Sequence, residues 1–315
     1  MHARHDPFVI LAIPTYRRPH GLGRLLEAVS RLDVPAGCRF AVAVIDNAPS
    51  PEVRKIVEQS NRRFPYDLRY IWFPARGLSK VRNRALDHAL AAGATHLGFI
   101  DDDEAPAPGW LCRHLEMQRS RLADASVGAV HAVYDTPAPH WLRRGGFLEM
   151  RHTENGARVP HAATSNVLFS LDPVRAHGLR FDTRYDFTGG EDTVFFDRYM
   201  ALGGEVVFAA RAIVEETIPA ARASLGWLWR RWRRTGQTSA ELVLARDPRA
   251  LERLRCALCG VARIGVGGLI ALISAPAAIT GNPTWARGVR IVARGAGFLD
   301  TVAGQRTLEY AHPDR

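Results

Sequence analysis

Hydrophobic and polar residues follow one another along residues 1–240 in a pattern that predicts an α/β domain. Short, nearly continuous apolar runs are separated by segments whose apolar residues recur at helical spacing. Strands of a parallel sheet have this unbroken apolar character because helices cover both faces of the sheet. The apolar runs lie at residues 8–14, 40–46, 68–73, 96–100, 128–134, 163–170 and 205–210, and the helical segments at residues 20–32, 51–62, 78–92 and 193–202. We therefore expect a Rossmann-like fold with a mostly parallel central sheet and helices on both faces.

The last part of the chain has a different pattern. Residues 227–234 combine tryptophan with arginine, and residues 264–286 contain no ionisable side chain. The uncharged stretch is long enough to cross a bilayer, which needs about 20 residues, but glycine and proline interrupt it, so an interfacial or re-entrant position fits equally well. Three arginines follow at the spacing of a basic helix lying on lipid, namely Arg287, Arg290 and Arg294. The pattern favours membrane association over the alternative, an ordinary buried helix pair.

The charge of the chain narrows its possible partners. The 315 residues carry a formal net charge of +10, and arginine supplies almost all of the positive charge. Such a balance favours anionic partners, which are nucleic acid, phosphorylated substrates or an anionic membrane surface. The four cysteines form no disulfide framework and the N-terminal residues contain no long apolar core, so we expect a cytoplasmic compartment and no secretory signal.

Three consecutive aspartates follow the apolar run at residues 96–100. Asp101, Asp102 and Asp103 repel one another unless a cation neutralises them, and Mg²⁺ or Mn²⁺ binds carboxylate oxygens together with substrate phosphates. The carboxyl end of a strand in an open α/β sheet is also where ligands bind. The alternative is a polar turn that caps the helix beginning near Trp110, since aspartate ends strands and caps helices well. The triplet alone does not separate these two interpretations.

Polar residues also end the first two predicted strands. The first strand ends in Pro14, Thr15, Tyr16 and Arg17, and the second ends in Asp46 and Asn47. Because adjacent parallel strands end at the same edge of a sheet, these residues should lie together. The Asp46 carboxylate could accept a hydrogen bond from a nucleobase, and Thr15 and Tyr16 could hold a ribose or a base face. For Asp46 and Asn47 the alternative is a simple turn.

Two helix starts complete the candidate site. Arg82 and Asn83 lie in a helix that opens after Gly77 and could face the same cleft, although a solvated basic helix face is the alternative. Glu191 and Asp192 follow two glycines at the start of another helix, where acidic residues commonly serve as caps. In a cleft that holds a metal, one of these two carboxylates could instead take the proton from an attacking hydroxyl.

Taken in order, these motifs resemble those of the family 2 inverting glycosyltransferases over residues 8 to about 240, and most closely those of bacterial enzymes of exopolysaccharide assembly. The resemblance implies a GT-A fold, a nucleotide-diphosphate sugar donor, most often a UDP-sugar, and Mg²⁺ or Mn²⁺. It also implies a GT-A domain at residues 1–240, with a nucleotide-binding half at about 1–105 and an acceptor half at about 106–240. Residues 241–315 would then form a helical, apolar and basic, membrane-associating region.

The resemblance assigns a role to each candidate residue. The nucleotide and donor sugar would be bound by Pro14, Thr15, Tyr16, Arg17, Asp46, Asn47, Arg82, Asn83, Asp101 and Asp102. Asp103, with Asp101, would hold the metal, and Asp192 would act as the catalytic base, with its neighbour Glu191 as the alternative. The acceptor or diphosphate side is assigned to Asn166, Trp229, Arg230, Arg233 and Arg234. The basic Trp/Arg segment matches the family's corresponding element only loosely, which fits transfer of a single sugar better than processive polymerisation.

The expected function is transfer of one sugar, with inversion, to an acceptor hydroxyl, such as that of a lipid-linked saccharide, at the cytoplasmic face of the bacterial inner membrane. The expected partners are the sugar nucleotide, the acceptor and an anionic membrane surface, without nucleic acid. A catalytically silent nucleotide-sugar-binding scaffold is one alternative. A basic nucleic-acid-binding protein is another, although acidic clusters weaken phosphate contacts. A nucleotidyltransferase would need a glycine-rich phosphate loop with a catalytic lysine, which the sequence lacks.

Overall fold

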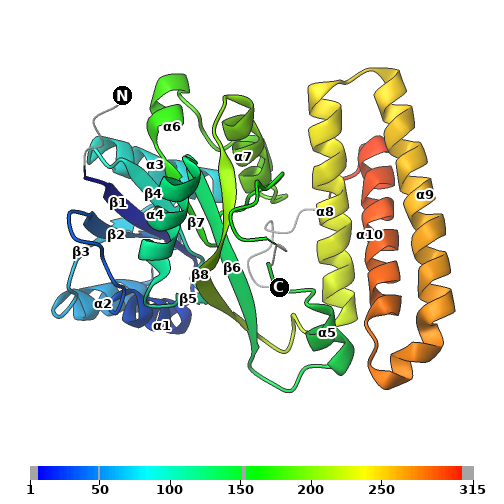
Figure 1. Ribbon diagram of the computed structural model, residues 1–315, viewed down its shortest axis with the longest axis horizontal. Coiled ribbons are helices and arrows are strands. Elements are labelled where there is room, and N and C mark those ends of the chain that lie inside the picture. Colours follow the sequence, from blue (N-terminus) through cyan, green and yellow to red (C-terminus); the bar gives the residue numbers. More distant parts are fainter. Residues whose placement is uncertain (1–5, 49, 151–153, 307–315) are drawn as a thin grey trace. The chain divides into compact units, whose positions relative to one another are not determined.

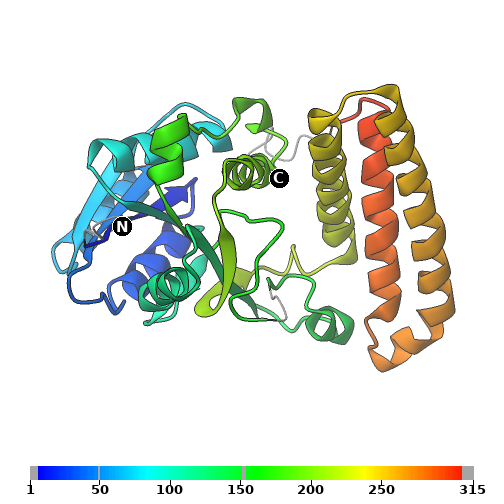
Figure 2. The same ribbon diagram turned by 45° about the horizontal axis from the view of Figure 1, so that its top comes forward.

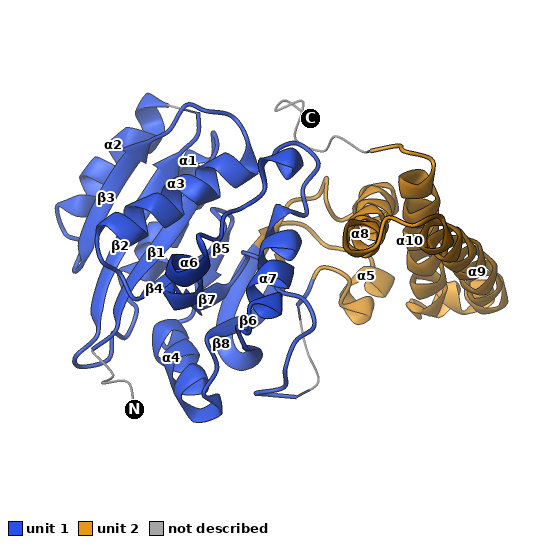
Figure 3. Ribbon diagram, turned by 90° about the horizontal axis from the view of Figure 1, so that it is seen from above, with its two compact units in different colours: residues 1–132, 149–216 blue, residues 133–148, 217–315 orange. Residues whose placement is uncertain are grey.

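The chain forms two compact units in the computed structural model, which describes residues 6–48, 50–150 and 154–306. Unit 1 comprises residues 1–132 and 149–216, and unit 2 comprises residues 133–148 and 217–315 (Figure 3). The boundary expected near residue 240 falls inside helix α8 (Leu225–Arg246), which belongs entirely to unit 2. The reason is that α8 packs along a later helix of the same unit, a contact that no local sequence pattern reveals.

Unit 1 is built around an eight-stranded sheet, counted over the described residues, with strand order β3-β2-β1-β4-β7-β6-β8-β5 (Figure 1). The strands are β1 (Phe8–Thr15), β2 (Arg39–Asp46), β3 (Asp67–Trp72), β4 (His96–Phe99), β5 (Glu104–Pro106), β6 (Ala125–Tyr134), β7 (Val167–Ser170) and β8 (Val206–Ile218). The α/β class expected from the sequence is confirmed, with a strand found close to each predicted apolar run.

Most strands of this sheet run in the same direction. Strands β3, β2, β1 and β4 pair in parallel, whereas β7 pairs antiparallel with both β4 and β6, and β5 pairs antiparallel with β8. Between the neighbours β6 and β8, the Ala125 N–H donates to the Glu205 carbonyl and the Asp135 N–H to the Ile218 carbonyl, so these two strands also run parallel. The sheet is therefore mostly parallel, as expected, with β7 and β5 reversed. Buried strands have the same continuous apolar character in either direction, so the sequence pattern does not identify the reversed strands.

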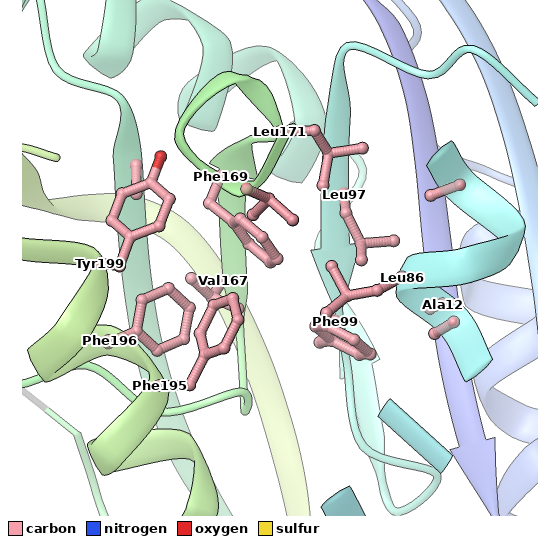
Figure 4. Close-up of a cluster of buried hydrophobic side chains, with 14 of the residues drawn as sticks. Ala12, Leu86, Leu97, Phe99, Val167, Phe169, Leu171, Phe195, Phe196 and Tyr199 are labelled. Carbon is pink, nitrogen blue, oxygen red and sulfur yellow. The ribbon is translucent and has the colours of Figure 1, made fainter. Parts of the chain in front are cut away.

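Helices cover both faces of the sheet. Alternate residues of β1 enter two separate cores: Val9 and Leu11 enter one, Ile10 and Ala12 the other. The first core is covered by α1 (Pro19–Val29), α2 (Pro51–Asn61) and α4 (Trp110–Arg121). The second is covered by α3 (Leu78–Ala91), α6 (Asp172–His177) and α7 (Glu191–Ala201), with the short helix η1 (Thr183–Tyr185) beside α3. Figure 4 shows the aromatic side chains of α7 packing on β7 in this second core.

A hydrogen-bonded polar network lies inside unit 1. The Asn166 side-chain oxygen accepts from the Trp110 indole at 2.6 Å and lies 3.0 Å from a ring nitrogen of His114, while its amide nitrogen donates to the Ala129 and Ala212 carbonyls, both at 2.8 Å. Because all of these groups are buried, the amide is fully used within the core. The expected role of Asn166 at the acceptor or diphosphate side is therefore wrong.

Lowering the pH should weaken the fold through His114. Burial lowers the pKa of this imidazole from 6.5 to about 4. Between these values the unfolded chain binds a proton that the folded protein does not, so stability falls as the pH drops from 6.5 towards 4, by about 3 kcal/mol in all. We expect urea unfolding across this range to show the loss in the wild type but not in His114→Gln. His20→Gln, at an exposed position, should keep the wild-type slope, and an equal fall in His114→Gln would contradict the assignment.

Unit 2 is a helical region, as expected for the C-terminal part of the chain. Its elements are α5 (His140–Gly145), α8, α9 (Ala250–Ser274), η2 (Ala275–Thr280) and α10 (Thr284–Val302). Helix α10 lies between α8 and α9 (Figures 1 and 2). Cys256 is buried against α8 and α10, whereas Cys259 is exposed.

Candidate active site

The ends of β1 and β2 and the loop after β4 meet at one edge of the sheet. Thr15 of β1 pairs with Asp46 of β2, and the backbone N–H of Asn47 donates to the Thr15 carbonyl at 3.0 Å. The buried Thr15 hydroxyl donates to Oδ2 of Asp102 at 2.8 Å, and the Tyr16 backbone N–H donates to the same oxygen at 3.4 Å. Three motifs that are far apart in the sequence therefore share one site.

Arg18 is a partner of the aspartate loop that the sequence analysis did not identify. Its Nη1 donates to Oδ1 of Asp102 at 3.0 Å and to Oδ2 of Asp103 at 2.7 Å. Asp102 is buried, whereas the Asp103 side chain remains 17% exposed and so accessible to a ligand. The available signal was a second arginine directly after the polar residues that end β1, but spacing alone gave it no role.

Asp101 lies where charged groups of three segments converge. Burial raises the pKa of its carboxyl to about 6; the Arg82 guanidinium opposes this rise, and the carboxylates of Asp103, Asp102 and Asp192 add to it. The aspartate loop, α3 and α7 are thus within electrostatic range of one another. Neighbouring carboxylates repel one another, which further raises the pKa of Asp101. A bound cation would offset this repulsion and stabilise the ionised carboxylates.

Helix α7 positions the two candidate catalytic carboxylates differently. Two glycines precede the helix with φ of 74° and 92°, a left-handed backbone that favours glycine. Glu191 is buried and forms an ion pair with the buried guanidinium of Arg82 on α3. Asp192 is half-buried, and its Oδ1 accepts from the backbone N–H of Thr193 at 2.6 Å and from the Thr193 hydroxyl at 3.2 Å. Asp192 is therefore the more accessible of the two.

Asp46 and Asn47 make the contacts of a turn. Asp46 is fully buried, and its carboxylate accepts from the Tyr70 hydroxyl at 2.8 Å and from the Ala48 N–H at 3.1 Å. Burial raises the pKa of Asp46, and these hydrogen bonds oppose the rise. The Asn47 amide nitrogen donates to two carbonyls of the segment after β3, both at 2.8 Å, and so holds this loop; nucleotide binding by Asn47 stays a prediction. Base recognition by Asp46 stays a prediction.

Asn83 makes structural contacts at this end of α3. Its amide nitrogen donates to the Phe181 carbonyl and its amide oxygen accepts from the Phe181 N–H, each at 2.9 Å. The side chain thus joins α3 to the segment before η1, and its expected role at the nucleotide stays a prediction. Neighbouring Arg82 is likewise engaged by Glu191, so it acts on the site through that carboxylate.

Two buried carboxylates beside the site were missed by the sequence analysis. Asp186 accepts from the backbone N–H of Lys80 at 3.2 Å and lies 3.4 Å from its ammonium group, at the start of α3. Glu104 accepts from the Asp101 N–H at 2.9 Å, and burial raises its pKa well above the usual range, with Asp101 adding to the rise. Neither residue stands in a distinctive motif, so only their burial identifies them.

The residues expected on the acceptor or diphosphate side are divided between the two units. Asn166 lies in the core of unit 1, whereas Trp229, Arg230, Arg233 and Arg234 lie on α8 of unit 2. Arg233 forms a bidentate ion pair with Asp300, in which Nε donates to Oδ2 at 2.6 Å and Nη2 donates to Oδ1 at 2.7 Å. This pair joins α8 to α10. The Arg233 side chain remains 41% exposed beside this pairing, and its expected substrate contact stays a prediction. Roles for Trp229, Arg230 and Arg234 stay predictions.

The aspartate loop fits a hard divalent cation that arrives with a substrate. Within residues 6–48, 50–150 and 154–306, no three His, Cys, Asp or Glu side chains already form a metal-binding group. Asp101 and Asp103 nevertheless offer two carboxylates in an acidic environment. Mg²⁺ and Mn²⁺ commonly bind one or two carboxylates and take their remaining ligands from phosphate and water. The donor set is therefore suited to a cation shared with a phosphorylated substrate.

In an α/β sheet, the carboxyl ends of the parallel strands are where ligands bind, and here acidic loops lie at that edge. Residues 10–181, more than half of the chain, match the family Glycosyl transferase family 2. The chain belongs to this family and is a glycosyltransferase. The resemblance inferred from the motifs is confirmed.

Individual relatives extend this comparison to nearly the whole chain. The chain is 33% identical over 299 residues to the succinoglycan biosynthesis protein ExoM of Rhizobium meliloti (strain 1021), covering 95% of this chain and 94% of ExoM. A mannosyltransferase of Pyrobaculum calidifontis in complex with GDP-Man and Mn²⁺ is similar in structure, with a TM-score of 0.61, 20% identity and coverage of 93% and 86%. S. aureus TarS 1-349 in complex with UDP has a TM-score of 0.53, 15% identity and coverage of 95% and 92%. At these identities the two structures establish the fold.

Proposed function

We propose that this glycosyltransferase moves a single sugar, with inversion, from a nucleotide-diphosphate sugar to an acceptor hydroxyl during assembly of a bacterial exopolysaccharide or another cell-surface glycan. The observation that carries the proposal is the convergence of Asp101, Arg82 and Asp192 from three segments. The biosynthetic context is supported by the name of the Rhizobium relative, which matches nearly the whole chain. The donor class is supported by the complexes of TarS with UDP-GlcNAc and of the mannosyltransferase with GDP-Man.

The donor nucleotide would lie along the ends of β1 and β2, against Pro14, Thr15, Tyr16 and Arg17. Arg17 is exposed, and its guanidinium lies 5.4 Å from the centre of the Tyr16 ring. An aromatic face beside a guanidinium suits a nucleoside diphosphate, because the ring can pack on the base or ribose while the cation contacts phosphate. Family frequency favours a UDP-sugar, with Asp46 as the candidate base contact. Asp102 would act indirectly, by orienting Thr15 and Arg18.

Asp103 and Asp101 would hold a divalent cation, in keeping with the Mn²⁺ in the complex of the Pyrobaculum relative. When bound, the cation neutralises charge on the departing nucleoside diphosphate. Arg18 already contacts the Asp103 carboxylate at 2.7 Å, so it can position this carboxylate toward the donor. The buried Asp102, fixed by Thr15 and Arg18, would keep the loop in place while the partly exposed Asp103 carboxylate meets the substrate.

Asp192 would serve as the general base. As the acceptor oxygen bonds to the anomeric carbon, the bond from that carbon to the diphosphate oxygen breaks, and the hydroxyl proton passes to the Asp192 carboxylate. Attack from the face opposite the leaving group inverts the anomeric configuration. Thr193 holds one carboxylate oxygen at 2.6 Å and so orients the group. Glu191 is a less suitable base because Arg82 engages its carboxylate in a buried ion pair.

The acceptor would be a saccharide, and a lipid-linked one in particular, at the cytoplasmic face of the bacterial inner membrane. In the described residues one helical segment, Ala250–Thr280, has the length and composition of a membrane-crossing helix, with a mean hydropathy of 2.1 and only 17% burial of its most apolar window. Arginines near an anionic leaflet contribute about 1 kcal/mol each to membrane attachment, and unit 2 is rich in them. Both features support membrane association.

Binding of sugar nucleotides to the full-length protein tests the proposal. A thermal-shift panel of UDP- and GDP-sugars with Mn²⁺ or Mg²⁺ should identify the donor, because a ligand at a hundredfold excess over Kd stabilises the folded state by about 2.7 kcal/mol. Transfer would then be followed as release of nucleoside diphosphate. The proposal would be contradicted if the protein bound no sugar nucleotide with either metal. Binding without transfer to any saccharide would favour the catalytically silent nucleotide-sugar-binding scaffold.

Replacing Asp103 by alanine should remove the metal dependence of donor binding. In the wild type, calorimetry should give tighter binding of the nucleoside diphosphate with Mn²⁺ than with EDTA, because carboxylate and phosphate share the cation. Asp103→Ala should bind equally weakly in both conditions. Asp67→Ala, which removes an exposed carboxylate on β3, serves as the matched control and should retain the wild-type difference. A full Mn²⁺ effect in Asp103→Ala would assign the metal to other residues.

A further inference from the structure

The side of α9 that faces away from α10 is an exposed apolar stripe. Its members recur at helical spacing and are 53–74% exposed, namely Leu251, Leu254, Leu258, Val261, Leu269 and Leu272. With a rise of 1.5 Å per residue, the stripe is about 30 Å long. A continuous apolar surface of this length is unusual on a soluble protein and marks a place where a partner binds.

The opposite side of α9 is closed by α10 through small residues. A Cβ added at Gly260 would lie 3.0 Å from the Gly295 carbonyl oxygen, and one added at Gly267 would lie 2.7 Å from the Gly288 carbonyl oxygen, so the two backbones are nearly in contact. Helix α10 packs on α8 with its other side, as Figure 2 shows. The outer helix of this three-helix layer is therefore α9, and its stripe is the face that remains open.

This packing argues against a membrane-crossing orientation of α9, although the segment Ala250–Thr280 is long and apolar enough for one. If α9 stood across a bilayer, α10 beside it would carry Arg287, Arg290 and Arg294 to the same depth, and α8 would follow with its own arginines. Charged side chains within the hydrocarbon region are costly. A helix that lies in the plane of the membrane avoids this cost, because only the stripe enters the leaflet.

The groups around the stripe suit lipid headgroups. Arg253 and Arg255 are exposed beside its N-terminal half, and beyond its other end the rings of Trp141 and Trp285 lie 5.1 Å apart. Tryptophan and arginine favour the headgroup level of a bilayer. Residues 225–306 contain thirteen arginines and four acidic residues. Two copies of such a surface repel each other, whereas an anionic leaflet attracts it, so charge complementarity selects lipid over a second copy of the chain.

We propose that α9 lies in the plane of an anionic bilayer, with the stripe embedded in one leaflet and α10 on the aqueous side. The proposal rests on the membrane association proposed above and specifies its geometry: the protein is held peripherally and no segment crosses the bilayer through α9. Unit 2 would then attach the chain peripherally to the membrane surface, where a lipid-linked saccharide is exposed.

The depth of individual stripe positions tests this geometry. In a full-length background with its four cysteines replaced by serine, a bimane fluorophore is attached to one cysteine at a time, in Leu254→Cys, Val261→Cys and Leu272→Cys. Each protein is bound to phosphatidylcholine–phosphatidylglycerol vesicles, and quenching by lipids with shallow and deep spin labels is compared. An in-plane helix gives similar shallow depths at all three positions. A crossing helix places Leu254 and Leu272 about 27 Å apart, near opposite surfaces, and Val261 closer to the midplane, so the depths are graded from shallow at the two ends to deep in the middle.

A pair of variants tests whether the stripe carries the attachment. Leu258→Gln/Leu269→Gln should lower partitioning onto the anionic vesicles by about 10²-fold, because two embedded leucines are lost. Leu122→Gln, at a 75% exposed leucine of unit 1, should leave partitioning unchanged. The proposal would be overturned by graded depths or by wild-type partitioning of the double variant. A dimer in sedimentation that the double variant abolishes would also overturn it, because the stripe would then bind a second copy of the chain. Sugar-nucleotide binding is measured separately, without lipid. If the variants and the wild type bind the sugar nucleotide equally well, a failure of the membrane tests concerns the geometry of α9 and not the proposed activity.

Discussion

Replacing Asp192 by asparagine is expected to lower kcat by about 10²- to 10⁴-fold, the usual cost of removing a general base. Asparagine has nearly the same shape and can still accept a hydrogen bond from the Thr193 N–H, so the start of α7 should be preserved. The amide cannot take up the proton of the acceptor hydroxyl. Donor affinity should therefore remain close to that of the wild type while turnover falls.

Single-turnover kinetics and calorimetry together check this expectation. Asp197→Asn, on the same helix, is the matched control and should keep wild-type turnover. The inverting mechanism is checked separately by the anomeric configuration of the product, determined by NMR. An Asp192→Asn enzyme with undiminished turnover would show that another group removes the proton, and Glu191→Gln would then be the next variant to measure.

The second large effect is expected on stability, from removal of Arg82. Its guanidinium and the Glu191 carboxylate are both buried and form an ion pair between α3 and α7. An Arg82→Met variant leaves the Glu191 carboxylate buried without its partner, and breaking a buried pair in this way costs about 3–5 kcal/mol. Urea unfolding should show this loss as a lower midpoint, and activity should fall because the helix that carries Asp192 is no longer held.

A double-variant cycle separates the ion pair from general damage to the core. In Arg82→Met/Glu191→Leu neither charge remains, so much of the lost stability should return, and the coupling between the two positions should be large. Arg84→Met, two residues further along α3, serves as the control for loss of an arginine from this helix. Equal destabilisation of the single and double variants would mean that the two side chains act independently.

Part of the candidate site could be predicted because its residues stand in local motifs. The three aspartates, the polar end of β1 and the acidic start of α7 each occupy the carboxyl end of a strand or the start of a helix, places where ligands collect in α/β sheets. Their order along the chain was sufficient to indicate the family, since it reflects how the fold brings those ends together. The roles of individual side chains at the site stay predictions.

Several of the candidate side chains have structural partners that the sequence analysis did not identify. Asn83 and Asn166 have amides that can bind a ligand or a backbone equally well, and the structure provides backbone partners 98 and 46 positions away, at Phe181 and Ala212. No local pattern reveals such partners. The same limit applies to Arg233, whose partner Asp300 lies 67 positions along the chain. Polar side chains with long-range partners are therefore the residues for which sequence spacing is least informative.

The sequence by itself determined the α/β class, the edge of the sheet that carries the acidic loops, and the apolar, arginine-rich character of the C-terminal region. These features follow from periodicity and charge, which are properties of neighbouring residues. Tertiary structure decided the reversed direction of β7 and β5, the engagement of Glu191 by Arg82, and the face of α9 that remains open. These three features depend on which distant segment packs beside each strand or helix. Burial and pairing involve two elements at once, so the sequence of one element alone does not determine them.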